Sequence, residues 1–257
     1  MKTLYLISTG PGDLAYLSPR AQWALQQCQH IVGYGLYLDL LGDTIQHSQQ
    51  HTLALGQETE RAELALDLSV TGQVTGLVSS GDIGIYAMAT LVFELLDHQT
   101  KPEWQDINIE VIPGISALQA LASRVGAPLA HDFCTISLSD LLTPWTTIEK
   151  RIHAAGQGDF VVSFYNPVSR KRRWQLETAK QILLKYKKAD TPVILGQNLC
   201  RDTESIQITT LAELDIEQVD MLTLVMVGNQ ETRIIDNHST SQNSHYIYTP
   251  RGYQAKK

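Results

Sequence analysis

Three glycine-bearing turns in the first half of the chain carry residue types suited to holding a small ligand. Each follows a run of residues that predicts a strand: STGPGD begins at Ser8, SSGD at Ser79 and PGIS at Pro113. In an open α/β sheet, ligands bind at the carboxyl ends of the strands, where glycine lets the main chain approach a ligand and leaves its amides free to bond it. One such turn alone is typical of an ordinary strand-to-helix connection, but three together favour a ligand site.

The spacing of these glycines does not match the two common phosphate-binding motifs. GxGxxG is absent after the first predicted strand, because Gly10 and Gly12 are followed by Ala15, and the sequence contains no GK[ST]. Pro11 also removes a main-chain amide that a phosphate cradle would use. The pattern therefore favours a ligand without phosphates, or one whose phosphates lie elsewhere.

Three groups of ionisable residues have alternative interpretations. Asp82 precedes a predicted helix, where a carboxylate can cap the helix or can accept hydrogen bonds from a ligand. His131 and Asp132 stand next to each other in a predicted loop, where they can take part in acid–base chemistry or in structural hydrogen bonding. His47 and His51 would share one face of a helix, but the glutamines around them indicate a solvated surface, so no metal site is expected.

The densest run of charge is Arg170-Lys171-Arg172-Arg173, at the start of a predicted helix. Cations there oppose the helix dipole, and a polycarboxylate ligand would compensate them through charge-assisted bonds to arginine. Arg20 and Arg124 are weaker candidates for the same role. The chain has 20 basic and 27 acidic residues, a net charge of −7, which makes it a poor generic binder of nucleic acid. The basic run is the one feature that supports a nucleic-acid regulator.

Strand-like and helix-like runs alternate along the 257 residues, which predicts an α/β fold with a mostly parallel sheet. The predicted strands are Thr3–Ser8, Gly76–Ser79, Asn108–Ile112, Cys134–Ser137, Asp159–Phe164, Pro192–Gly196 and Leu222–Val227. The predicted helices are Ser18–Cys28, Glu58–Ser69, Gly84–Asp97, Ser116–Val125, Thr146–Ala155 and Arg173–Tyr186. A Gly-Ala-Pro break ending at Pro128 predicts two α/β domains, 1–128 and 129–240. The polar stretch that starts at Asn237 predicts a linker to a C-terminal tail, 241–257.

Composition places the chain among ordinary globular proteins, with 43% hydrophobic and 18% charged residues. No apolar run approaches the roughly 20 residues that a membrane span needs, and the first apolar stretch is shorter than a signal-peptide core. The three cysteines are widely spaced and form no CxxC pair, which disfavours a disulfide framework or a cysteine-rich zinc site. We therefore expect a cytoplasmic protein with no membrane partner.

These motifs together resemble the tetrapyrrole methylases, which are S-adenosylmethionine-dependent enzymes of cobalamin and sirohaem synthesis. The resemblance rests first on STGPGD at 8–13, SSGDIGIY at 79–86 and IPGISA at 112–117. HDFCTISLSDLLTPW at 131–145, FYNPVSRKRR at 164–173 and TPRGY at 249–253 are similar to the branch of the family that methylates C17 of a precorrin-3 macrocycle. The resemblance covers nearly the whole chain.

The resemblance implies two α/β domains with the cofactor in a cleft between them, usually in a homodimer. It implies methyl transfer from S-adenosylmethionine to C17 of precorrin-3B, or of a cobalt-precorrin-3, coupled to ring contraction in vitamin B12 synthesis. The partner would then be a small tetrapyrrole and not a nucleic acid. Methylation at another carbon, and a non-catalytic tetrapyrrole-binding protein, are the alternatives.

Carried onto this sequence, the resemblance implies the following site residues. The expected cofactor-binding residues are Gly81, Asp82, Ile83, Tyr86, Ser116, Ala117, Asn166, Asn198, Val227, Gly228 and Asn229. The expected substrate-binding residues are Pro11, Arg170, Arg172 and Arg173. His131 and Asp13 are the candidates for the proton transfers that ring contraction needs. The chain departs from the family pattern at Ser8, Ile83 and Ala87, none of which removes a chemically necessary group.

Overall fold

The computed structural model describes residues 2–169, 172–236 and 245–253, and the chain divides into two compact units. Unit 1 is Met1–Ala117 and unit 2 is Leu118–Lys257. The boundary therefore precedes the Gly-Ala-Pro break that the sequence pointed to. The reason is helix α5 (Ala117–Val125), which packs on the sheet of unit 2: a Cβ added at Gly196 of that sheet would lie 2.6 Å from Leu121 of the helix.

Unit 1 is built on a parallel sheet of five strands in the order β3-β2-β4-β1-β5. The strands are β1 (Thr3–Ser8), β2 (His30–Tyr34), β3 (Gln49–Leu53), β4 (Thr75–Ser79) and β5 (Asn108–Ile112). The predicted α/β class and parallel pairing are confirmed here. Because β1 lies between β4 and β5, the turns that follow these three strands are neighbours at one edge of the sheet.

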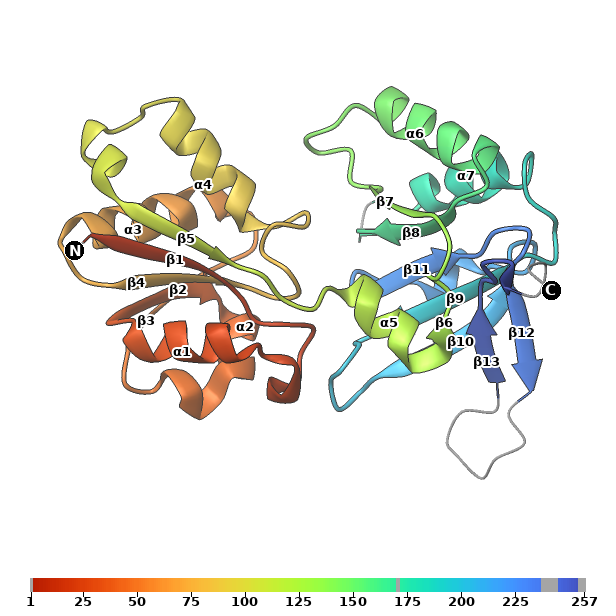
Figure 1. Ribbon diagram of the computed structural model, residues 1–257. Coiled ribbons are helices and arrows are strands. Elements are labelled where there is room, and N and C mark those ends of the chain that lie inside the picture. Colours follow the sequence, from red (N-terminus) through yellow and green to blue (C-terminus); the bar gives the residue numbers. More distant parts are fainter. Residues whose placement is uncertain (1, 170–171, 237–244, 254–257) are drawn as a thin grey trace. The chain divides into compact units, whose positions relative to one another are not determined.

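Helices cover both faces of the unit 1 sheet, as Figure 1 shows. The helices α1 (Pro19–Gln27) and α2 (Gly35–Leu41) lie on one face, and α3 (Glu58–Val70) and α4 (Met88–Asp97) on the other. Short 3-10 helices are η1 (Leu14–Tyr16), η2 (Gly42–Ile45) and η3 (Pro102–Asp106). Alternate residues of β1 point to opposite faces, so Leu6 packs with α3 and α4 while Ile7 packs with α1 and α2, and both are fully buried.

Two helix starts in unit 1 differ in how well the sequence predicted them. The start of α1 is as predicted, with Ser18 Oγ accepting a hydrogen bond from the Ala21 amide at 3.1 Å and Pro19 in the first helical position. The helix predicted from Gly84 begins at Met88 instead. Tyr86 has a φ of 51°, in the left-handed region, which no right-handed helix can include.

Strands β2 and β3 escaped the sequence analysis, and they place the histidines differently from the expected helix. His51 lies in β3, a polar strand at the sheet edge, and its Nε2 lies 3.0 Å from Nδ1 of His30 in β2. The other His30 ring nitrogen meets the side chain of Gln73. Burial and then His30 lower the pKa of His51 from its ordinary value of 6.5.

This histidine pair makes an acid dependence of stability testable. Because the pKa of His51 is lowered in the folded state, the contribution of the neutral ring to the free energy of unfolding is present above about pH 6.5 and is lost as the pH falls. A ring-to-ring bond needs one proton between the two nitrogens, so protonating both rings breaks it. We expect the fall in melting temperature between pH 7 and pH 5 to be about 2–4 °C smaller in His51→Gln than in the wild type. The exposed His47, changed to Gln, should leave the fall unchanged, and an unchanged fall in His51→Gln would contradict the assignment.

Unit 2 has a mixed five-stranded sheet in the order β10-β9-β11-β8-β7. The strands are β7 (Phe133–Ser137), β8 (Val161–Tyr165), β9 (Pro192–Gln197), β10 (Ser205–Thr210) and β11 (Thr223–Val227). β7 and β8 are parallel, whereas β11 runs antiparallel to both β8 and β9. It follows that β7, β8 and β9 all end at the same edge of this sheet.

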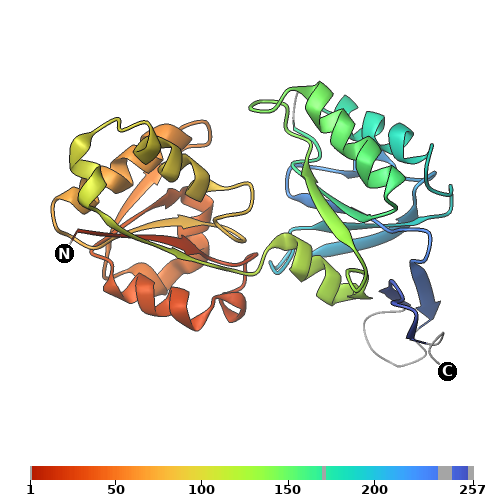
Figure 2. The ribbon, with the colours of Figure 1, turned by 45° about the horizontal axis from the view of Figure 1, so that its top comes forward.

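Helices α6 (Trp145–Gln157) and α7 (Trp174–Leu183) lie side by side over one face of the unit 2 sheet (Figure 2). The short helix η4 (Ile216–Gln218) completes this core. A second, small sheet has the order β12-β13-β6, from Arg233–Asp236, His245–Tyr248 and Gly126–Ala127. The expected tail from 241 is therefore joined to unit 2 through β13, while the expected linker residues 237–244 lie outside the described residues.

Within the described ranges, no helix combines the length and the apolar character needed to cross a membrane. All three cysteines are free thiols, and burial raises the pKa of Cys28 to about 12. The described residues contain no group of three or more metal-ligating side chains that could hold a metal ion.

Candidate active site

The first two glycine turns of unit 1 are hydrogen-bonded directly to each other. The Gly10 amide donates to the Gly81 carbonyl at 3.1 Å, and the Gly81 amide donates to the Gly10 carbonyl at 2.7 Å. Both glycines have positive φ, 73° and 69°, a conformation that glycine adopts without strain. The turns after β1 and β4 therefore form one continuous main-chain surface.

Asp82 ties the third turn to the second. One carboxylate oxygen accepts the Gly84 amide at 2.8 Å, within its own turn, and the other accepts the Gly114 amide at 3.0 Å. Ser8 adds a further link, because its hydroxyl accepts the Ile83 amide at 2.9 Å. Of the two interpretations of Asp82, structural bonding to main-chain amides is the one the geometry supports.

The glycine amides are committed within the protein, contrary to our expectation that they would be free for a ligand. Those of Gly10, Gly81 and Gly114 each donate to a neighbouring turn. The physical reason is that closely packed neighbouring turns satisfy each other's main-chain polar groups. The three turns thus act as a rigid platform, and a ligand must be recognised by the groups that line its rim.

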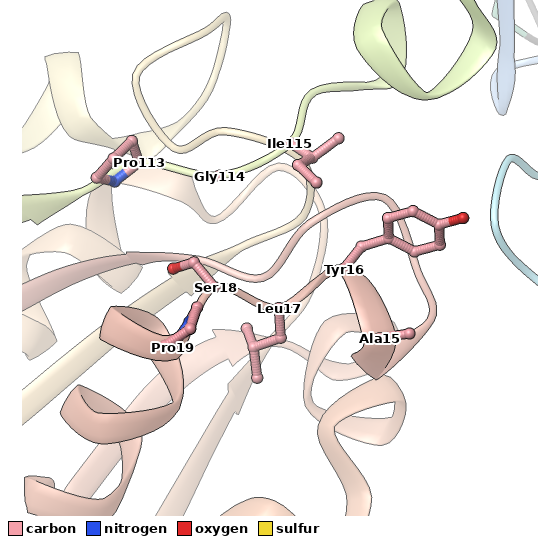
Figure 3. Close-up of a pocket in the computed structure, with 8 residues that line it drawn as sticks. All are labelled: Ala15, Tyr16, Leu17, Ser18, Pro19, Pro113, Gly114 and Ile115. Atoms are coloured by element: carbon pink, nitrogen blue, oxygen red, sulfur yellow. The ribbon is translucent and has the colours of Figure 1, made fainter. Parts of the chain in front are cut away.

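A cavity of about 410 Å³ adjoins this platform, between the segment after β1 and the turn after β5 (Figure 3). Its lining residues are Ala15, Tyr16, Leu17, Ser18, Pro19, Pro113, Gly114 and Ile115. The predicted substrate residue Pro11 is buried in the same segment, whereas Asp13 is exposed. One Asp13 carboxylate oxygen accepts the Ala15 amide at 2.8 Å, which places this acid next to the cavity wall.

The other expected cofactor residues of unit 1 differ in what they expose. The Ile83 side chain is fully buried in the core, so only its main chain can meet a ligand. Tyr86 is 50% exposed beside the platform, while Ser116 is buried. Ala117 is the last residue of unit 1. Gly81 faces Ser116, since a Cβ on Gly81 would lie 3.8 Å from the Ser116 Cα.

In unit 2, Asn166 and Asn198 lie at the same edge of the sheet, after two strands that have β11 between them. They follow β8 and β9, which run in the same direction, and both have a φ of 50°. The Asn166 amide nitrogen donates to the Ser137 hydroxyl at the end of β7, at 3.0 Å. Non-glycine residues in the left-handed region persist where the surroundings hold them, and they cluster at functional sites.

His131 and the turn Val227-Gly228-Asn229 lie at the opposite edge of the same sheet. His131 precedes β7 and accepts the Asp132 amide, and Val227 pairs with Val162 near the start of β8. Five residues of strand, roughly 16 Å, separate this edge from Asn166. Val227 is also buried, and the side-chain Oδ1 of Asn229 accepts hydrogen bonds within its own turn. The structure therefore does not bring these four residues together with Asn166 and Asn198.

The basic run is bound within unit 2 where the structure describes it. Arg172 Nη1 donates to the Leu138 carbonyl at 2.7 Å, and its Nε lies 3.6 Å from Asp140. Arg173 donates to the main chain of η4 and lies 3.3 Å from Glu217. Arg170 lies outside the described residues. Arg172 and Arg173 therefore hold loops of unit 2 in place, and their expected contacts with the substrate stay a prediction.

Sequence reasoning missed three features of the unit 2 edge. Leu141 and Leu142, after β7, are 83% and 98% exposed, an unusual display of apolar surface. The Tyr165 hydroxyl accepts the Leu118 amide at 3.0 Å and so fixes the start of α5. Arg201, after β9, has a buried Nε without a hydrogen-bond partner in the part of the chain that the structure describes. The SLSDLL sequence carried a signal for the first feature, whereas the other two depend on tertiary contacts.

The family model for Tetrapyrrole (Corrin/Porphyrin) Methylases matches residues 3–215. A cobalt-factor III methyltransferase of Priestia megaterium is 43% identical over 98% of this chain, although the chain spans only 45% of that longer protein. A probable cobalt-factor III C(17)-methyltransferase of Salmonella typhimurium is 44% identical over 97% of this chain and 99% of its own length. A precorrin-3B C(17)-methyltransferase of a Sinorhizobium species is 39% identical over 98% and 97%.

Among solved structures, that of the methyltransferase CobJ superposes with a TM-score of 0.87 at 34% identity. The match covers 96% of this chain and 99% of that one. This chain therefore belongs to the tetrapyrrole methylase family.

Proposed function

We propose that this protein transfers a methyl group from S-adenosylmethionine to C17 of a precorrin-3-type macrocycle, with ring contraction, in cobalamin biosynthesis. The observation that carries this function is the similarity over nearly the whole length to C(17)-methyltransferases at 39–44% identity. The second-half sequence block supports the position of methylation, because the glycine turns are common to the family.

The platform of unit 1 fits a cofactor that lacks phosphates. Its turns offer no P-loop, Pro11 has no amide, and the glycine amides are already bonded. Gly114 lets its turn pack closely against the other two, because a Cβ there would lie 2.4 Å from the Ser8 Cβ. Gly81, Asp82, Ser116 and Tyr86 would hold or shape the cofactor. When bound, S-adenosylmethionine supplies the methyl group as a sulfonium electrophile with a neutral leaving group.

The remaining chemical tasks fall to the chain's own residues. Methyl transfer needs the reacting atoms in line and about 3–3.5 Å apart, so the rigid turns contribute mainly by positioning. Ring contraction also needs protons to move. Asp13 is exposed beside the cavity of unit 1, so we keep it as the acid–base candidate in preference to His131, which lies at the far edge of the unit 2 sheet.

The function is tested by incubating the purified protein with S-adenosylmethionine and either precorrin-3B or cobalt-factor III. Product mass and carbon-13 spectra should show one added methyl at C17 of one of these macrocycles. Methylation at another carbon would overturn the positional assignment. Cofactor binding without turnover of any precorrin would favour a binding protein.

We further propose that the protein works in the cytoplasm as a homodimer, as the family resemblance implies. Light scattering on the purified protein should give twice the 28.6 kDa mass of one chain. A mass of one chain at working concentration would contradict the dimer.

Asp82 provides a direct test of the platform. Asp82→Ala removes the acceptor of both the Gly84 and the Gly114 amides. We expect a loss of about 1–3 kcal/mol in the free energy of unfolding. The affinity for S-adenosylhomocysteine should fall at least tenfold by calorimetry, because the turns lose their mutual register. Asp97→Ala, an exposed acid at the end of α4, is the control, and an unchanged affinity in Asp82→Ala would contradict the role of the platform.

A further inference from the structure

Arg201 is a partly buried arginine whose side chain has no polar partner among the described residues. Its Nε is inaccessible to solvent and makes no hydrogen bond. The guanidinium forms no hydrogen bond or ion pair with any residue in the described part of the chain; the only bonds of Arg201 are through its main chain. A buried donor on a charged group is costly when unpaired, which makes Arg201 a candidate for contact with an anionic ligand.

Two acids follow Arg201 in sequence: Asp202 is exposed and forms no ion pair with it among the described residues, and Glu204 is held by other groups. Glu204 accepts Arg124 Nε at 2.8 Å and the Cys200 amide at 2.6 Å. These bonds brace a turn in which both Asn198 and Cys200 have left-handed φ values, 50° and 59°. In this turn the Glu204 carboxylate therefore pairs with Arg124, and the charge of Arg201 has no counterion among the described residues.

The position of Arg201 connects it with the candidate site. It follows β9, so its turn lies at the edge where β7, β8 and β9 end and where Asn166 stands. The described arginines of this region that the sequence pointed to, Arg172 and Arg173, are engaged in protein contacts. Arg201 therefore offers the binding capacity that the basic run was expected to supply.

We propose that Arg201 binds a carboxylate of the tetrapyrrole macrocycle. The guanidinium fork matches a carboxylate in geometry and charge. The macrocycle carries several carboxylates into a protein of net charge −7, whereas the carboxylate of the cofactor is balanced by its own ammonium group. The inference rests on the proposed function for the identity of the macrocycle, and the cofactor is the other source of a carboxylate.

The test compares Arg201→Gln, Arg201→Lys and the wild type, with Arg151→Gln as the control. Arg151 is exposed on α6, and its replacement by glutamine removes the same charge from the same unit. We expect Arg201→Gln to raise KM for the macrocycle about 10- to 100-fold with kcat within about threefold. Arg201→Lys should show a smaller rise in KM, and Arg151→Gln should leave KM unchanged. Calorimetry should give an unchanged Kd for S-adenosylhomocysteine, and the melting temperature should not fall, because no protein contact is removed.

Three results would overturn the assignment. The first is an unchanged KM of Arg201→Gln for the macrocycle, and the second is a lower affinity of this variant for S-adenosylhomocysteine alone. The third applies if Arg201→Gln does not fold: the wild type then binds cobalt-factor III and its fully esterified form with equal affinity. If the wild type methylates no macrocycle, the proposed function fails separately. Absorbance titration of the wild type and Arg201→Gln with cobalt-factor III then still tests the carboxylate contact.

Discussion

Replacing Asp159 by asparagine is expected to lower the free energy of unfolding by about 2–4 kcal/mol. Asp159 Oδ1 lies 3.0 Å from the ammonium of Lys187, whose side chain is completely buried. Lys187 also donates to the Phe160 carbonyl at 2.8 Å, which leaves Asp159 as its only charged partner among the described residues. Asparagine keeps the shape of the side chain and tolerates the φ of 51° at this position, so the variant removes the charge and exchanges one of the two oxygens that accept the exposed Gln230 amide for an NH2 group.

The same variant should make stability depend more steeply on pH. Burial lowers the pKa of Lys187, while the hydrogen bond and charge of Asp159 oppose that shift. Without Asp159 the pKa falls further, so between this value and the ordinary 10.5 the unfolded state binds more protons than the folded state. Stability therefore rises with pH in this range. In urea unfolding, the free energy of unfolding should increase more from pH 7 to pH 9.5 in Asp159→Asn than in the wild type.

Two further variants separate the buried pair from charge effects in general. Glu231→Gln breaks an exposed pair with Arg233 at 3.6 Å and should cost less than about 1 kcal/mol. Adding Lys187→Met to Asp159→Asn removes the unpaired charge and should recover most of the lost stability. Equal losses in Asp159→Asn and Glu231→Gln would contradict a special cost of burying Lys187.

The sequence predicted the unit 1 platform well because the relevant information is local. A strand followed by a glycine turn and a helix, repeated, implies parallel strands that all end at one edge, and the β4-β1-β5 order of the structure brings the turns together. Strand β3 was missed because its sequence, QQHTL, is polar and lies at the sheet edge, where burial does not impose an apolar pattern.

The sequence predicted the unit 2 site less well because strand direction and side-chain partners are not local. β11 runs antiparallel to its neighbours, which moves Val227 to the edge opposite Asn198. His131 is only a few residues from Ser137 in sequence, yet a whole strand separates them. Likewise, the charge of Arg172 is visible in the sequence, but its contact with the Leu138 carbonyl depends on the folded loop.

Gly114→Ala is expected to separate the three turns of unit 1 and to abolish cofactor binding at working concentrations. A Cβ on this residue would lie 2.4 Å from the Ser8 Cβ and 2.6 Å from the Gly81 carbonyl oxygen. Neither atom belongs to a flexible side-chain end, so the main chain of the turns has to move. We expect a destabilisation of about 1–3 kcal/mol and a fall in affinity for S-adenosylhomocysteine of about 100-fold or more, because misplacement by about 1 Å has large effects on a preorganised site.

Gly72→Ala distinguishes loss of the platform from loss of stability. Gly72 has a φ of 88°, with no atom within 4 Å of the added Cβ, so alanine there strains the main chain by about 1–2 kcal/mol without a collision. It precedes β4, at the opposite end of the strand from Gly81. The two variants should melt at similarly lowered temperatures, yet Gly72→Ala should bind S-adenosylhomocysteine like the wild type. Equal affinities in the two would show that the close approach of the turns serves stability alone, whereas a selective loss in Gly114→Ala makes their mutual contact the basis of cofactor binding.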